Sequence, residues 1–154
     1  MVTVERLLVR DRPAMTLRVR LGPKARGSSL PSFATVEWVG LAGHPSSYGM
    51  LTGARSDTSR LAIADEGGAR FRDSLAANAD TVLWGLPDEY RSAVVSALDD
   101  EVQGALVSQA AHGEVGSSRD VFTALTHLLC RVLAGGLPDN DEDVWRLLDK
   151  CWQA

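Results

Sequence analysis

The clearest pattern of apolar and polar positions lies in the second half of the chain. Apolar residues recur at helical spacing from Tyr90 to Val102, and charged residues fall largely outside that stripe. This spacing predicts an amphipathic helix. Pro87 suits its first turn because proline has no N–H to leave unpaired, and Gly104 is a suitable end.

A second helix follows. Ser117 is a candidate N-cap, and Asp120, three residues later, would complete a capping box. One apolar face then continues for about five turns, until Gly136. The apolar segment 105–111 is too short for a helix and predicts a buried strand, and 81–84 predicts a strand before the first helix. The expected order is strand, helix, strand, helix.

The first half of the chain reads as strands. Residues 2–9 and 15–21 flank a short turn and predict a hairpin, and 33–41 predicts a third strand. Residues 48–52 and 60–64 predict two shorter strands. The fold class expected is therefore α+β, with a mostly antiparallel sheet and the two main helices packed on one face of it.

The end of the chain predicts a third amphipathic helix. Asn140 or Asp141 can cap it, and its apolar side consists of Val144, Leu147, Leu148 and Cys151, flanked by Trp145 and Trp152. Such a stripe must be covered, either by the domain itself or by a second copy in a homodimer. We expect a single α+β domain over residues 1–136, with the helix of 137–154 packed on it or on a partner.

Composition narrows the function classes. The chain has 154 residues and 45% hydrophobic residues, which suits one domain with a core. It has no membrane-length apolar run and no secretory signal, so the expected location is cytoplasmic.

Its two cysteines, Cys130 and Cys151, fall in predicted helices and suit reduced packing thiols. Neither a metal nor a cofactor is expected. Abundant Arg, Ala, Gly and Val suggest a bacterial source.

Charge is unevenly distributed along the chain, whose net charge is -4. Residues 1–26 are basic and the segment after Gly135 is acidic. A contact surface for phosphates or for an acidic protein is one interpretation of the basic segment, and a solvated strand face with a flexible loop is the other. The candidate binding residues are Arg18 and Arg20 on the second strand and Lys24 and Arg26 in the following loop.

Two stretches, GLPDEYRSAVVSAL and HGEVGSSRDVFTAL, together resemble domain IV of translation elongation factor G and the related ribosomal-protection proteins. The resemblance covers about residues 81–133 and rests on helix-opening positions in both stretches. The matching residues are Pro87, Glu89, Tyr90, His112, Glu114, Val115, Ser117 and Ser118. The chain departs from the family at Gly116, where the family has Asp, at Arg119, where it has Glu, and at Gly85, which lies one residue closer to the proline.

The resemblance implies a left-handed strand-helix-strand crossover, against the general right-handed rule. It also implies a contact with RNA or the ribosome, because an early glycine-rich loop of the family's domain reaches the decoding site. The sequence has no GxxxxGK[ST] phosphate loop, so it lacks the GTPase part of the full factor.

Catalytic patterns are sparse. The sequence contains no GxSxG nucleophile motif, and its acidic run 99–101 places neighbours on different sides of a helix. His112 precedes a helix start that holds Ser117, which leaves a small hydrolase or transferase as the alternative. The function expected is a non-enzymatic binding module that contacts RNA, the ribosome or an acidic protein partner, with His112 and Ser117 as further candidate binding residues.

Overall fold

Strands that pair in chain order form the first half of the fold, and helices that return over them form the second. The computed structural model describes residues 3–12, 14–40, 47–63, 68–77 and 80–153. The strands are β1 (Val4–Asp11), β2 (Ala14–Leu21), β3 (Ala34–Gly40), β4 (Ser47–Arg55), β5 (Arg60–Leu61), β6 (Val82–Trp84) and β7 (Ala105–Gly113). The helices are α1 (Asp88–Asp100), α2 (Arg119–Gly135) and α3 (Asp141–Gln153).

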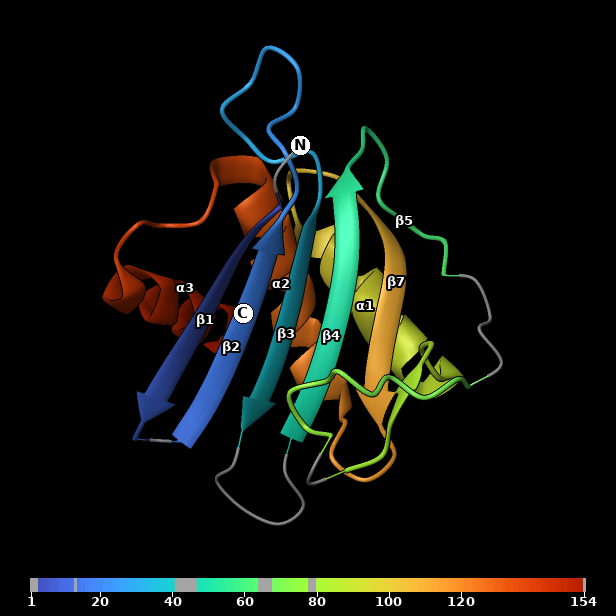
Figure 1. Cartoon of the computed structure of the whole chain (residues 1–154). Helices are drawn as coiled ribbons and strands as arrows, with labels where there is room; N and C mark the ends of the chain where they lie inside the picture. The colour runs from blue at the N-terminus through green and yellow to red at the C-terminus, as the bar shows by residue number, and fades with distance from the viewer. Residues whose placement is uncertain (1–2, 13, 41–46, 64–67, 78–79, 154) are drawn as a thin grey trace.

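The sheet is mostly antiparallel, as expected (Figure 1). Strands β1 to β4 pair antiparallel in chain order, and β7 pairs antiparallel with β4. On the other side of β7, β5 lies parallel to its first half and β6 lies antiparallel to its second half. The expected crossover was that of the unit β6, α1 and β7. Because β6 and β7 pair antiparallel, the handedness rule for parallel strands does not apply to this unit.

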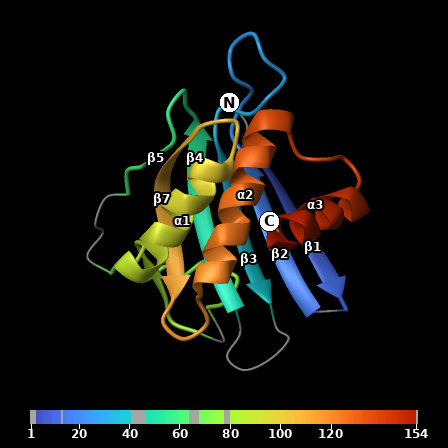
Figure 2. The ribbon, with the colours of Figure 1, turned by 180° about the vertical axis from the view of Figure 1, so that it is seen from behind.

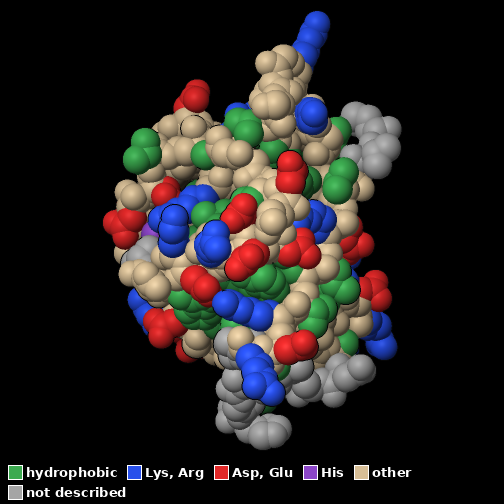
Figure 3. All heavy atoms as spheres, turned by 90° about the vertical axis from the view of Figure 1, so that its left-hand side faces the viewer, with side chains coloured by type: hydrophobic (Ala, Val, Ile, Leu, Met, Phe, Trp, Pro, Cys, Tyr) green, Lys and Arg blue, Asp and Glu red, His purple; other side chains and the backbone are tan. Residues whose placement is uncertain are grey.

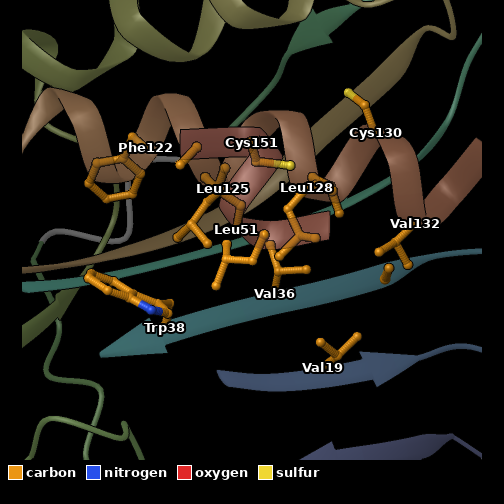
Figure 4. Packing of buried hydrophobic residues seen from close by; sticks show 14 of the residues in the cluster. Val19, Val36, Trp38, Leu51, Phe122, Leu125, Leu128, Cys130, Val132 and Cys151 are labelled. Atoms are coloured by element: carbon orange, nitrogen blue, oxygen red, sulfur yellow. The ribbon is translucent and has the colours of Figure 1, made fainter. Parts of the chain in front are cut away.

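All three helices lie on one face of the sheet, with α2 between α1 and α3 (Figure 2). Inward side chains of β2, β3 and β4 meet the apolar side of α2 in the main core (Figure 4). A Cβ atom at Gly49 of β4 would lie 2.7 Å from Val121 and 2.9 Å from Leu125. The absence of a side chain at this position therefore lets α2 approach the sheet closely. Each large side chain buried here contributes about 1.5–3 kcal/mol.

Helix α3 covers the part of this face nearest β1 (Figure 2). Asn140 Oδ1 accepts from the Glu142 N–H at 2.8 Å, which satisfies a free donor of the first turn. Trp152 makes an edge contact with Trp38 of β3, with 5.2 Å between the ring centroids. The buried residues of the helix are Val144, Trp145, Leu148 and Cys151. Much of the apolar side of α3 is thus covered within the chain.

Two arginines of β1 bind acidic residues of α3. Arg10 donates to Asp149 Oδ1 at 3.2 Å, and its guanidinium carbon lies 5.5 Å from the centroid of the Trp145 ring. Arg6 pairs with the carboxylate of Asp141. The basic beginning and the acidic end of the chain therefore neutralise each other in part. Such partly exposed pairs are worth up to about 1 kcal/mol each.

The opposite face of the sheet has a second, smaller core. The segment that leads into β6 crosses this face over β3, β4 and β7 (Figure 1). Phe71 stacks on Trp84, with 4.3 Å between the ring centroids. The buried members of this core are Val39, Tyr48, Met50, Phe71, Ala76, Val82 and Ala111. The centre of the sheet is therefore covered on both faces.

Glu37 of β3 joins this covering segment to the sheet. Its side chain is 2% exposed, and its Oε2 accepts from the Tyr48 hydroxyl at 2.6 Å and from the Leu75 N–H at 2.9 Å. Its Oε1 accepts from Arg18 Nε at 2.8 Å, and Arg18 also donates to the Asp73 carbonyl at 2.9 Å. Burial, and then the Glu37 charge, raise the pKa of Tyr48, so its hydroxyl remains a donor. Both carboxylate oxygens are satisfied.

Two sequence-based details were wrong. Val102 was placed on the apolar stripe of the first helix, but α1 ends at Asp100 and Val102 is fully exposed. Ser118, not Ser117, caps α2, because its Oγ accepts from the Val121 N–H at 3.3 Å. The sequence also predicts a turn at residues 43–47, most of which lie outside the described residues. Gly136 ends α2 as expected, with a positive φ of 80°.

We predict that Tyr48→Phe lowers the free energy of unfolding by about 2 kcal/mol, because a hydrogen bond to a buried carboxylate is lost. Tyr90→Phe is the matched control, since its hydroxyl donates to the neutral Ser117 carbonyl at 2.9 Å. That variant should lose about 1 kcal/mol. Urea unfolding measures both. Equal losses in the two variants would contradict a stronger hydrogen bond to the buried Glu37 carboxylate than to a neutral carbonyl.

Candidate functional site

The structure divides the four predicted basic contact residues into two pairs. Arg18, whose side chain is 15% exposed, is held by Glu37 and by the Asp73 carbonyl. Arg20, with 39% exposure, donates from Nε to Glu5 Oε1 at 3.1 Å. Both guanidinium groups therefore already have carboxylate partners in the chain. Their charges contribute less to an outside ligand than the sequence suggests.

The second pair lies on a hairpin that extends beyond β2 and β3, residues 22–33, which we call the basic arm. The sequence suggested an irregular loop, but the Gly22 N–H donates to the Phe33 carbonyl and the Ala25 N–H to the Leu30 carbonyl, both at 2.9 Å. At its tip Gly27 has a φ of 72°, which glycine adopts without strain. The segment is thus a hydrogen-bonded extension of the sheet.

The basic arm projects from one end of the molecule (Figures 1 and 3). Lys24 and Arg26 are exposed, and neither forms an ion pair with a described residue. Arg12, at the turn between β1 and β2, is also exposed but lies at the other end of β2 from the arm. The arm therefore presents two cations together on a protruding support.

His112 and Ser117 lie at the other end of the sheet from the arm. His112 Nδ1 is 2.9 Å from the Gly85 carbonyl, which places the ring proton on Nδ1. The Ser117 hydroxyl donates to the Tyr48 carbonyl at 2.7 Å and accepts from the Gly113 N–H at 2.8 Å. These contacts join β7, β4 and the entrance of α2. The hydroxyl proton of Ser117 is used within the fold and not shared with a histidine.

The distance between these two regions follows from the strand register. The arm leaves the sheet after Leu21, which pairs with Ala34 at the start of β3. Ser117 contacts Tyr48, which pairs with Val39 near the end of β3. The six candidate binding residues therefore do not form one site. The arm and the region around His112 have to be considered separately.

Two structural carboxylates were missed from the sequence. Asp80 accepts from the Gly116 N–H at 2.8 Å and stabilises the turn between β7 and α2. Glu101, just after α1, lies 3.2 Å from His127 Nδ1 and 3.4 Å from Arg131 Nε of α2. The side chain of His127 is 5% exposed. In the sequence, His127 lies on the apolar side of a predicted helix, which indicates that it has a polar partner. The pattern alone could not identify Glu101 as that partner.

The described residues contain no group of three or more His, Cys, Asp or Glu side chains placed to hold a metal ion. A cavity of about 200 Å³ lies between α2 and α3, lined by Asp120, Thr123, Ala124, Cys151 and Trp152. None of the described helices is long and apolar enough to cross a membrane.

Comparison with known proteins gives one partial match. A ketol-acid reductoisomerase (NADP(+)) of Haloarcula marismortui is 36% identical over 72 residues, which are 46% of this chain and 21% of that protein. The chain spans about a fifth of the length of this curated relative. No protein-family model matches the chain. No solved structure matches it either.

We predict that neither cysteine of the native protein reacts with a thiol reagent such as DTNB at pH 8. Burial is the main cause that raises the pKa of Cys130 to about 12 and of Cys151 to about 11, so both remain neutral thiols, not thiolates. Both should react once the protein is unfolded in urea. The absorbance of the thiolate released from the reagent follows the reaction. Rapid labelling of the folded chain would contradict this burial.

We predict that His112→Ala lowers the free energy of unfolding by about 1 kcal/mol, because the hydrogen bond to the Gly85 carbonyl is lost. Glu114→Ala, an exposed position of the same turn, is the control and should leave stability unchanged within about 0.5 kcal/mol. Thermal or urea unfolding measures both. A His112→Ala protein that is as stable as the parent but lacks an assayable activity would instead favour the enzyme alternative.

Proposed function

We propose that this chain is a non-enzymatic binding module that contacts RNA, most directly ribosomal RNA, through the basic arm. The exposure of Lys24 and Arg26 on a protruding hairpin is the observation that carries the proposal. The other basic residues of the first two strands have carboxylate partners. The arm thus offers an outside polyanion two neighbouring cations that form no ion pair with a described residue.

The build of the arm suits such a contact. Pairing of its two sides holds Lys24 close to Pro31 across the hairpin, and Ser32 donates from Oγ to the Pro23 carbonyl at 2.6 Å. A preorganised support lowers the entropy that ordering on binding would cost. Phosphates along a nucleic acid match cations presented in a short row. The net charge of -4 disfavours a contact that wraps the whole chain.

We also propose that residues 81–133 form a unit like domain IV of elongation factor G. Three hydrogen bonds join the two stretches that carry the resemblance: His112 to the Gly85 carbonyl, Tyr90 to the Ser117 carbonyl and Arg119 to the Glu89 carbonyl. The Tyr90 bond joins two matching positions, and each of the other two joins a matching position to one where the chain departs from the family, Gly85 or Arg119. The two stretches therefore contact each other, which supports the proposed unit. In such a domain a contact with the ribosome is the expected role.

We predict that the chain binds a single-stranded RNA oligonucleotide at low salt and that Lys24→Gln/Arg26→Gln weakens this binding. Each phosphate contact contributes about 0.7 to the slope of log K against log salt, so the double variant should reduce the slope by about 1.4. Fluorescence anisotropy across a salt series measures it. Purified small ribosomal subunits provide a second probe.

Arg12→Gln is the matched control, because it removes one exposed cation at the far end of the sheet. This substitution should leave the affinity and the salt slope nearly unchanged. The free energy of unfolding should be nearly the same in all variants. Binding that does not depend on salt, or no binding of RNA or ribosomes at low salt, would overturn the proposal. Equal effects of the Arg12 and arm variants would show net charge, not the arm, to be responsible.

A further inference from the structure

Phe33, at the base of the basic arm, is an aromatic side chain that is open to solvent. It is 36% exposed, and it is the one aromatic residue among the large hydrophobic residues that are exposed in the described part of the chain. Single exposed apolar side chains are common on protein surfaces. What distinguishes Phe33 is its position on the same hairpin as the exposed cations Lys24 and Arg26 (Figure 1).

Gly22, on the opposite side of the hairpin, fixes the place of the Phe33 ring. The Gly22 N–H donates to the Phe33 carbonyl at 2.9 Å, so the two residues face each other beyond the last pair of β2 and β3. A Cβ atom at Gly22 would lie 2.4 Å from both Cδ1 and Cε1 of the ring. The ring therefore occupies the space that a side chain at position 22 would fill.

The Phe33 ring lies on the side of the arm that faces away from the helices. Side chains alternate along β3, with Val36 in the main core on the helix side and Glu37 on the opposite face. Phe33 is in phase with Glu37. On the helix side, Leu30 of the arm lies beside Gly136 at the end of α2, with its Cδ2 3.9 Å from a Cβ atom placed there. The arm is thus supported on one side and presents the ring on the other.

We propose that an unpaired base of single-stranded RNA stacks on the Phe33 ring while its neighbouring phosphates contact Lys24 and Arg26. This inference rests on the proposed function of the arm. Every base has a π-face, so stacking on an aromatic side chain recognises a single strand whatever its sequence. In a duplex the bases are stacked on one another and are not free to cover the ring. The ring therefore shifts the preference of the arm toward single-stranded RNA.

The spacing of the three side chains suits this contact. Lys24 follows Gly22 by two residues, which is about 7 Å along an extended chain. A base on the Phe33 ring therefore brings its own phosphate within reach of the Lys24 ammonium group. Neither Lys24 nor Arg26 forms an ion pair with a described residue. Aromatic rings beside a cationic path for the backbone are the combination with which proteins hold single strands.

Fluorescence anisotropy with a single-stranded RNA oligonucleotide and with a duplex of the same sequence tests the proposal. Phe33→Leu should weaken binding of the single strand by about 5- to 150-fold, which is the usual effect of removing one stacking ring. It should leave duplex binding and the salt slope nearly unchanged, because no charge is removed. Phe33→Tyr should bind like the parent. Val95→Ala, at a position 44% exposed on α1, is the matched control and should also bind like the parent.

The outcomes separate this inference from the proposed function. If Phe33→Leu binds both RNAs like the parent while Lys24→Gln/Arg26→Gln still lowers the salt slope, stacking is overturned and the contact of the arm with RNA stands. An equal loss on both RNAs also overturns stacking, because a ring that only supports the hairpin would affect either ligand. A parent that binds neither RNA at low salt overturns the proposed function and this inference together. Urea unfolding verifies that each variant is folded.

Gly22→Ala tests the position of the ring independently. This variant keeps Phe33 and both cations but places a methyl group where the ring lies, so the ring has to move. Binding of the single strand should weaken as it does in Phe33→Leu. In a protein that already carries Phe33→Leu, the same substitution should have little further effect. Unchanged binding by Gly22→Ala, or losses that add in the double variant, would overturn an action through the ring.

Discussion

The centre of the sheet is buried on both faces, and Glu37 is the polar group on which the second face depends. Helices α1 and α2 cover one side with a continuous apolar core. The other side is covered by a segment with little regular structure, which needs specific polar contacts to stay in place. Glu37 provides them through Arg18, Tyr48 and Leu75. A buried charge is costly unless every oxygen is satisfied, and here each one is.

The same requirement for partners determines what remains available at the surface. Arg18 is used by Glu37, Arg20 by Glu5, and Arg6 and Arg10 by α3. The segment of residues 1–26 is strongly basic in sequence, but most of its arginines form ion pairs within the chain. Two kinds of unmatched surface are left at the β1 and β2 side of the molecule. One is the basic arm, with its exposed cations, and the other is the open edge of β1, with its exposed Leu7 and Val9.

The sequence predicted the fold class and most elements because their signals are local. The spacing of Ala93, Val94, Ala97 and Leu98 predicts α1, and these residues are the ones that α1 buries. The sequence could not show pairings between distant residues. The pairing of Arg6 with Asp141 spans the whole chain, and Glu37 lies in a strand whose pattern gives no sign of what covers it. For the same reason the four basic candidates looked alike, although Arg18 is an internal residue and Arg26 is exposed.

We propose that the basic arm is the surface that contacts RNA. The most direct measurement is a two-dimensional ¹⁵N–¹H NMR titration of the labelled chain with a single-stranded RNA oligonucleotide at low salt. We expect the amide shifts to change along residues 22–33 and at the strand ends that support them, while the amides around His112 and Ser117 stay unchanged. Changes centred on His112 and Ser117, or no changes at all, would contradict it.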